Sequence, residues 1–102
     1  MKIHSLLGFA QRAGKIISGE QGVKTALRRR KVHCLIISKD SSNNTRHRYI
    51  KMAENNNVTW YLYGTKNELG QILGKSQRAI VAVTDSGFAN AIKTFMKTTK
   101  DS

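Results

Sequence analysis

Hydrophobic positions along this chain repeat with two different periods. From Ile3 to Ala13 they recur every three or four residues, which predicts a helix with one apolar face, and Gly14 is placed to end it. Three short runs are instead almost continuously apolar, β-branched or aromatic, as in the strands of a sheet. These predicted strands are residues 32–38, 58–63 and 79–83.

Helical spacing returns in the segments between these runs. Ser18 stands at the N-cap position of a second helix that runs to about Arg30, and Gln21 follows at the capping-box spacing. A short extended piece at residues 15–17 leads into this helix. Further helices are predicted over about 43–54, between Thr65 and Gly74 behind a second capping box, and from Asp85 onward, with a frayed tail over residues 97–102.

This alternation of helices and strands predicts the fold class. Helical connections of such length join strands that run in parallel, and they cover both faces of the sheet. With 102 residues and 39% hydrophobic content, the chain can bury one core of modest size. We therefore expect a single α/β domain over residues 1–102, a three-layer α/β/α sandwich around a mixed, mostly parallel sheet of about four strands.

Charge narrows the choice of partner. The 18 Lys and Arg residues outnumber the 6 Asp and Glu residues, which gives a formal net charge of +12 at pH 7. A polyanion such as nucleic acid relieves the self-repulsion that this charge creates. No apolar run is long enough to span a bilayer, and no terminal helix has the aromatic face of a membrane-surface anchor, so we expect no membrane partner.

The sequence contains few residues that could bind a metal ion or take part in redox chemistry. Cys34 is the one cysteine, which excludes an internal disulfide and a multi-cysteine metal site. Its place within an apolar run predicts a buried, inert thiol. The first residues lack the apolar block of a secretory signal. We therefore expect a cytoplasmic protein without a metal or cofactor.

The helix that begins near Ser18 is the first candidate for anion binding. Its start offers free backbone N–H groups and the positive end of the helix dipole. Lys24 and Arg28 stand four residues apart and share a face, and the helix closes on the cations at 28–31. Gly22 lowers helix propensity in the first turn, which predicts the close approach of a backbone. The alternative is a basic face that is only solvated.

Two aspartates support a different interpretation. Asp40 and Asp85 each follow a predicted strand, where open α/β sheets often place sites, so a phospho-relay module or metal-dependent enzyme is one alternative. The simpler interpretation is that each aspartate caps the helix that follows it. A module that docks on an acidic protein partner is a further alternative.

Several short motifs follow one another in a characteristic order. They are Leu6-Leu7-Gly8, Arg12-Ala13-Gly14-Lys15, Ser18-Gly19-Glu20, Cys34-Leu35-Ile36-Ile37-Ser38-Lys39-Asp40 and Ala82-Val83-Thr84-Asp85. In this order they resemble the ribosomal protein L7Ae/L30e family, and within it the small bacterial YlxQ-type members, over nearly the whole chain. The resemblance implies an α/β/α sandwich without catalysis that binds RNA, typically at kink-turns with tandem sheared G·A pairs.

The resemblance also implies where RNA is read. In the family, the reading turn has a Gly, one further residue, Asn-Glu, and a Lys three positions beyond the Glu. Gly19 matches the Gly, Gln21 stands at the Asn, Gly22 at the Glu and Thr25 at the Lys, with Lys24 beside it. Since Gly22 has no side chain to accept from guanine, the sequence leaves open whether the RNA is a kink-turn or another structured element.

Together these observations predict a non-catalytic RNA-binding protein, ribosomal or ribosome-associated and monomeric. Polar loops at 39–42 and 75–78 complete the candidate surface, because an alternating order can bring them and the start of the basic helix to one end of the sheet. The predicted RNA-binding residues are Gly19, Gln21, Gly22, Lys24, Thr25, Arg28, Lys39, Asp40, Lys75, Ser76, Gln77 and Arg78, with Arg12 and Lys15 as added phosphate contacts.

Overall fold

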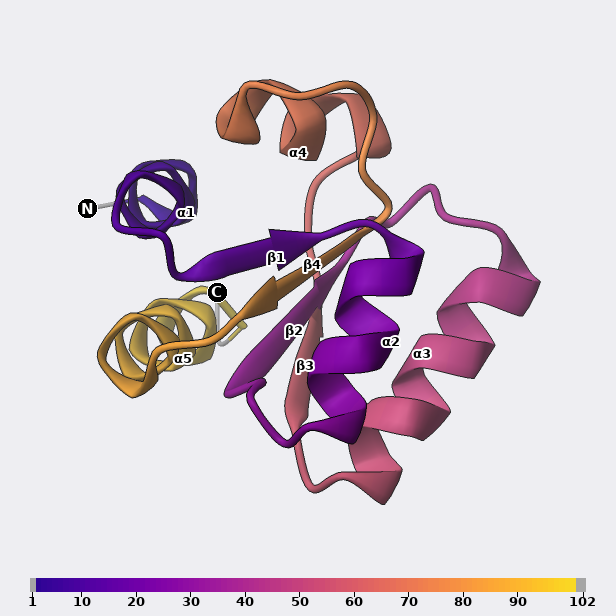
Figure 1. Ribbon diagram of the computed structural model, residues 1–102. Helices are drawn as coiled ribbons and strands as arrows, with labels where there is room; N and C mark the ends of the chain where they lie inside the picture. The colour runs from indigo at the N-terminus through magenta and orange to yellow at the C-terminus, as the bar shows by residue number, and fades with distance from the viewer. Residues whose placement is uncertain (1, 101–102) are drawn as a thin grey trace.

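The computed structural model describes residues 2–100, and the side chains of residues 2–96, as one sheet with helices on both faces (Figure 1). In chain order the elements are α1 (Ile3–Arg12), β1 (Ile16–Ser18), α2 (Glu20–Arg28), β2 (Cys34–Ile37), α3 (Asn43–Asn55), β3 (Thr59–Leu62), α4 (Lys66–Leu73), β4 (Ile80–Val83) and α5 (Ser86–Lys100). The α/β class and the number of strands are as the hydrophobic pattern predicts, and the extended piece before α2 is a strand.

The sheet is mixed, with the strand order β1-β4-β2-β3. β2 pairs with β3 in parallel, while β4 lies antiparallel between β1 and β2. The parallel share is thus smaller than the sequence predicted. The cause is α4, which packs on α1 near the end of the sheet where β3 finishes, so that the chain re-enters from that end and β4 runs the opposite way (Figure 1).

The two central strands, β2 and β4, are buried along their whole length. Cys34 and Ile36 of β2 pack with residues of α1, α4 and α5 on one face of the sheet. Leu35 and Ile37 pack with residues of α2 and α3 on the other face. Both faces of the sheet are therefore covered by helices, which is the three-layer arrangement that continuous apolar runs predict.

Polar side chains cap the first turns of three helices. The Ser42 hydroxyl accepts an N–H of α3 at 3.1 Å, and the Asp85 carboxylate accepts an N–H of α5 at 2.9 Å. At α4, Thr65 and Glu68 form the capping box that the sequence predicts. Each cap satisfies backbone donors that the helix itself leaves unpaired. The prediction that Asp85 caps the helix that follows it is confirmed.

The start and end of α2 differ from the prediction. Ser18 is the last residue of β1, where it pairs with Val81, and it does not cap the helix. Gly19 takes the N-cap position with φ 89°, a left-handed conformation that suits glycine. At the other end Arg30 adopts φ 57°, so α2 ends at Arg28 rather than at Arg30. Strand pairing therefore overrides the local capping signal of Ser18.

The last helix, α5, runs from Ser86 to Lys100. No Gly or Pro after Gly87 interrupts it, and it includes residues 97–100 of the tail that the sequence predicts to be frayed. Residues 101 and 102 lie outside the described part of the chain. Neither α5 nor any other described helix combines the length and hydrophobicity needed to cross a membrane.

Burial makes the Cys34 thiol a probe of folding. Its side chain is 2% exposed, and burial raises the pKa of the thiol to about 12. The thiol therefore stays protonated at pH 8, where free cysteine begins to ionise. We expect a thiol reagent at pH 8 to label native Cys34 at least about a hundredfold more slowly than the urea-unfolded chain, because labelling requires opening of the core. Equal labelling rates in both states would contradict the burial.

Candidate nucleic-acid interface

Polar segments meet at one end of the sheet. β1, β2 and β3 finish there and β4 begins there, so the start of α2, the segment after β2 and the segment before β4 come together (Figure 1). We call this region the loop end, made of residues 18–22, 38–42, 63–66 and 75–79. The structure thus brings together the three segments that the sequence predicted to gather.

Backbone hydrogen bonds fix the loop end. The N–H of Gly19 donates to the carbonyl of Ile80 at 3.1 Å, and the N–H of Lys39 donates to the carbonyl of Gly64 at 2.8 Å. The N–H of Arg78 donates to the carbonyl of Lys66 at 3.0 Å. Each bond joins segments that are far apart in sequence, so the segments of the loop end hold one another in place.

Arg78 fastens the 75–78 loop to the end of β1. Its Nε donates to the Ser18 hydroxyl at 3.2 Å, and its Nη1 donates to the Ser76 hydroxyl at 2.8 Å and to the Gln77 carbonyl at 3.0 Å. Through these hydrogen bonds the guanidinium holds the loop in place. The sequence suggested Arg78 only as an RNA contact, because the pairing with Ser18, 60 positions earlier, leaves no local signal. Lys75, Ser76 and Gln77 remain exposed.

Gly70 lets the same loop lie directly on α4. A Cβ atom at Gly70 would stand 2.3 Å from the carbonyl oxygen of Ser76, a distance that no side chain tolerates. The N–H of Lys75 also donates to the carbonyl of Gly70 at 2.8 Å. The backbone of the loop thus needs a helical position without a side chain.

The first turn of α2 is open to solvent. Gly19 provides no side-chain cap, and Gln21 and Gly22 are exposed. On the same helix, Lys24 and Thr25 are half-buried and Arg28 is exposed, while the apolar face made of Val23, Ala26 and Leu27 is buried against the sheet. The predicted contact residues therefore lie on the outer side of a helix whose first N–H groups receive no side-chain cap.

Gly22 allows α2 to lie close to β1. A Cβ atom there would stand 3.0 Å from Cγ2 of Ile17, which is tighter than ordinary contact. The close neighbour is a methyl group of the strand beneath, not a backbone as the sequence suggested. Glycine lowers the helix propensity at this position, but it allows α2 to pack more closely on the sheet.

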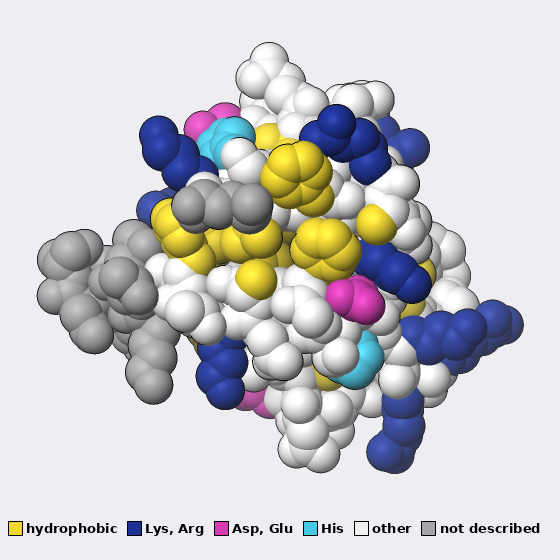
Figure 2. Space-filling view, turned by 90° about the vertical axis from the view of Figure 1, so that its left-hand side faces the viewer, with side chains coloured by type: hydrophobic (Ala, Val, Ile, Leu, Met, Phe, Trp, Pro, Cys, Tyr) yellow, Lys and Arg dark blue, Asp and Glu magenta, His cyan; other side chains and the backbone are white. Residues whose placement is uncertain are grey.

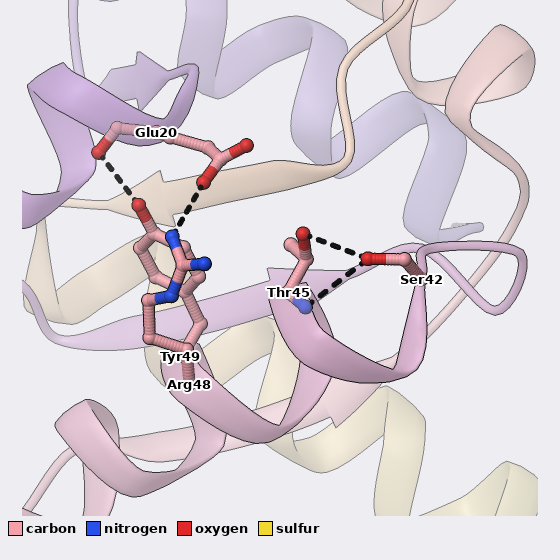
Figure 3. A network of polar contacts seen from close by, with 5 residues as sticks. All are labelled: Glu20, Ser42, Thr45, Arg48 and Tyr49. Carbon is pink, nitrogen blue, oxygen red and sulfur yellow. Dashed lines mark hydrogen bonds and ion pairs between the residues drawn. The ribbon is translucent and has the colours of Figure 1, made fainter.

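Glu20, at the start of α2, is turned toward α3. Its carboxylate lies 3.4 Å from Nη1 of Arg48, and its backbone carbonyl accepts from the Tyr49 hydroxyl at 3.0 Å (Figure 3). Both charged side chains are about half exposed, so the ion pair itself stabilises the fold little. The contact with Tyr49, whose side chain is buried, positions α3 beside the start of α2.

Asp40 serves a helix other than the predicted one. Its Oδ1 accepts the backbone N–H of Lys66 at 2.9 Å, and this bond lowers the pKa of the Asp40 carboxyl. The carboxylate therefore supports the start of α4, while Ser42 caps the α3 helix that follows Asp40 in sequence. Sequence reasoning missed this role because α3 and β3 separate Asp40 from Lys66 along the chain.

The two aspartates do not form a shared site. In the pairing of β2 with β4, Ile37 faces Ile80 and Cys34 faces Val83. Asp40 follows one end of this ladder and Asp85 the other, so antiparallel pairing places them at opposite ends of the sheet. No group of three or more His, Cys, Asp or Glu among the described residues is arranged to hold a metal ion. The structure therefore does not bring together the two aspartates that the enzyme alternative uses.

Arg12 and Lys15 also lie away from the loop end. The carbonyl of Lys15 accepts from Thr84, so Lys15 stands at the opposite end of β1 from Gly19. The Arg12 guanidinium lies 5.0 Å from the centre of the Phe9 ring, a cation–π distance. Figure 2 shows the face formed by α1 and α5, where apolar side chains gather between Lys and Arg side chains. These two cations are not brought together with the other predicted contacts.

The acidic residues are occupied within the protein. Arg48–Glu20 is the only ion pair among the described residues. The other acidic residues that the structure describes accept from polar groups: Asp40 from the Lys66 N–H, Glu54 from the Trp60 ring N–H, Glu68 from the Thr65 N–H and Asp85 from the Phe88 N–H. No Lys or Arg of the loop end or of α2 forms an ion pair among the described residues, which favours an external polyanion.

Comparison with known proteins shows the family of this chain. Residues 1–93 match the ribosomal protein L7Ae/L30e/S12e/Gadd45 family. The chain is 35% identical to the RNA-binding protein YlxQ of Bacillus subtilis (strain 168) over 92 residues, which are 90% of this chain and 92% of that protein. It is 30% identical to the RNA-binding protein YlxQ of Enterococcus faecium, over 90% of this chain and 88% of that protein.

A solved structure has the same fold. It is described as that of a protein with unknown function from Bacillus halodurans C, and it superimposes with a TM-score of 0.88 at 28% sequence identity. The match covers 92% of this chain and 95% of the other. Neither the family description nor the names of the two YlxQ relatives is that of an enzyme.

The contact between Gly70 and the 75–78 loop can be tested with two alanine variants. We expect Gly70→Ala to lower the free energy of unfolding by about 1–3 kcal/mol, because the new methyl group displaces the loop backbone. Gly8→Ala is the matched control: nothing lies within 4 Å of a Cβ atom there, and alanine favours the α1 helix by about 0.5–1 kcal/mol.

Urea unfolding gives both free energies, and backbone amide NMR shifts of residues 75–78 report the position of the loop. Stability and loop shifts in Gly70→Ala that equal those of the unmodified protein would contradict the contact.

Proposed function

Because the chain belongs to the ribosomal protein L7Ae/L30e/S12e/Gadd45 family, we propose that it is a non-catalytic protein that binds structured RNA through the loop end. The observation that carries this proposal is the exposed first turn of α2 beside uncompensated cations. Two relatives that align with most of the chain are named RNA-binding proteins. A partner of this kind would also relieve the self-repulsion of the net charge of +12.

The start of α2 has the chemistry for an RNA backbone. Its first N–H groups and the positive end of the helix dipole favour a phosphate, and Glu20 is held toward Arg48 on α3. Lys24 and Arg28 lie one turn apart on the same helix and would contact successive phosphates. The Gln21 amide, which can donate and accept, would read a base edge.

The 75–78 loop would form the second side of the RNA site. Arg78 and Gly70 hold the loop in one conformation before RNA arrives, so binding costs little ordering of the backbone. Lys75, Ser76 and Gln77 are exposed and would contact a sugar or phosphate. Lys39 would add a cation at the rim, whereas Asp40 would act by supporting α4.

The proposed RNA is a kink-turn-like element. Ordinary A-form helices hide base edges in a narrow major groove, so a small protein reads bases where the helix is distorted. Gly22 offers no carboxylate to a guanine, so recognition would depend on Gln21, on backbone donors and on the shape of the kink. Ribosomal RNA in the cytoplasm is the proposed source, and a monomer is the proposed binding form.

Selectivity for a kinked RNA tests the proposal directly. We expect a kink-turn RNA to bind at least about tenfold more tightly than a plain duplex of equal length, about 1.4 kcal/mol, at every salt concentration. The measurement is a titration of both RNAs with the unmodified protein across a salt series. Equal affinities that both fall steeply with salt would show binding by charge alone and would contradict recognition of the kink.

The cations of α2 can be tested separately. We expect the double variant Lys24→Ala with Arg28→Ala to bind kink-turn RNA more weakly. We also expect the slope of log K against log salt to become shallower by about 2, because each phosphate contact contributes about 0.9 to this slope. A matched control is Arg12→Ala with Lys15→Ala, which removes the same charge away from the loop end. Equal losses of slope in the two double variants would contradict an RNA contact specific to α2.

A further inference from the structure

We propose that the outer face of α3 is a second site for RNA phosphates, beside the loop end. This inference rests on the proposed RNA binding and extends it to a surface that neither the sequence pattern nor the names of the relatives assign. An RNA arm that leaves the loop end on the α3 side would be held along this helix.

A shallow hollow of about 710 Å³ lies along the first two turns of α3. Its polar lining is made of Asn43, Asn44, Arg46, His47, Arg48 and Lys51, and Ile50 completes it. These groups are donors or cations, and no carboxylate lines the hollow. Amide, imidazole, guanidinium and ammonium donors at this spacing suit phosphate and sugar oxygens.

Arg46 is positioned in advance. Its Nη1 donates to the carbonyl of Lys39 at 3.1 Å, and its Nη2 donates to the side-chain oxygen of Asn43. The guanidinium is therefore held at the junction of the loop end and α3, and Lys39 belongs to both surfaces. A guanidinium fixed by such bonds loses less side-chain entropy when it meets a phosphate.

The acidic groups nearest to α3 are engaged within the protein. Glu20 pairs with Arg48 of α3 itself, and Glu54 accepts from the ring N–H of Trp60 at 3.3 Å near the far end of the helix. His47 and Lys51 are exposed, stand four residues apart and share a face. No acidic side chain of the described residues pairs with Lys51, so its ammonium is available to an external anion.

The arrangement of α2 and α3 makes the two surfaces continuous. Both helices begin at the loop end and run side by side down the same face of the sheet (Figure 1). The hydrogen bond from the Tyr49 hydroxyl to the carbonyl of Glu20 joins the middle of α3 to the start of α2 (Figure 3). Phosphates of one RNA could therefore pass from the first turn of α2 over Lys39 and Arg46 to Lys51.

Two kink-turn RNAs and two charge-reversal variants test this second site. One RNA has minimal arms, and the other has an arm extended by one helical turn. We expect the extended RNA to bind more tightly than the minimal RNA. We expect Lys51→Glu to lower the affinity for the extended RNA about tenfold and to change the affinity for the minimal RNA by less than about twofold. Lys93→Glu is the control, because Lys93 is an exposed residue of α5 and the substitution changes the net charge equally. We expect it to weaken the binding of both RNAs by less than about threefold.

A second measurement is independent of charge reversal. We expect backbone amide NMR shifts of His47 and Lys51 in the unmodified protein to change with the extended RNA and not with the minimal RNA. Thermal unfolding of both variants verifies that each is folded.

The outcomes separate the second site from the proposed function. Tight binding of the minimal RNA, with no gain from the longer arm and no amide shifts in α3, would overturn the second site alone. Equal weakening by Lys51→Glu and Lys93→Glu would also overturn it. Failure of the unmodified protein to bind either RNA would overturn the proposed function, and the second site with it.

Discussion

The structure depends on two strands that have no polar side. β2 and β4 are buried along their whole length, so helices must cover both faces of the sheet and water reaches only the strand ends. Polar segments can then emerge only where strands finish or begin. The insertion of β4 between β1 and β2 brings the start of α2, the segment after β2 and the 75–78 loop to one such end. Burial at the centre of the sheet thus decides where a binding surface can form.

The loop end is built from interactions that join distant parts of the chain. Arg78 bonds to Ser18, Asp40 supports the start of α4, and the 75–78 backbone lies on Gly70. These groups hold the segments of the loop end in place, while neighbouring side chains stay exposed. Such a division is expected of a preorganised surface, because a loop that is already ordered spends little free energy on ordering when a partner binds. The same logic explains why Gly70 and Gly22 carry no side chain: each lets one backbone segment lie closer to its neighbour.

Charge complements this geometry. The described acidic residues cap helices, hold an indole N–H or pair with Arg48, and each of them is directed into the protein's own framework. The cations, by contrast, have few internal partners. Acidic groups therefore support local structure while Lys and Arg side chains remain available to the surroundings, both along α2 and on the outer face of α3. Proposed RNA binding by this member of the L7Ae/L30e/S12e/Gadd45 family follows from that imbalance as much as from the fold.

Sequence alone determined the elements, the α/β class, the capping box at Thr65, the cap at Asp85 and the basic character of α2, because each depends on neighbours within a few positions. Tertiary structure decided the rest. Ser18 entered β1 instead of capping α2, Asp40 supported α4 instead of α3, β4 ran antiparallel, and Arg12 and Lys15 lay away from the loop end. Each of these outcomes depends on a hydrogen bond or strand pairing between residues far apart in the chain. Periodicity and local propensity contain no information about such partners, since only packing of the whole sheet brings them within bonding distance.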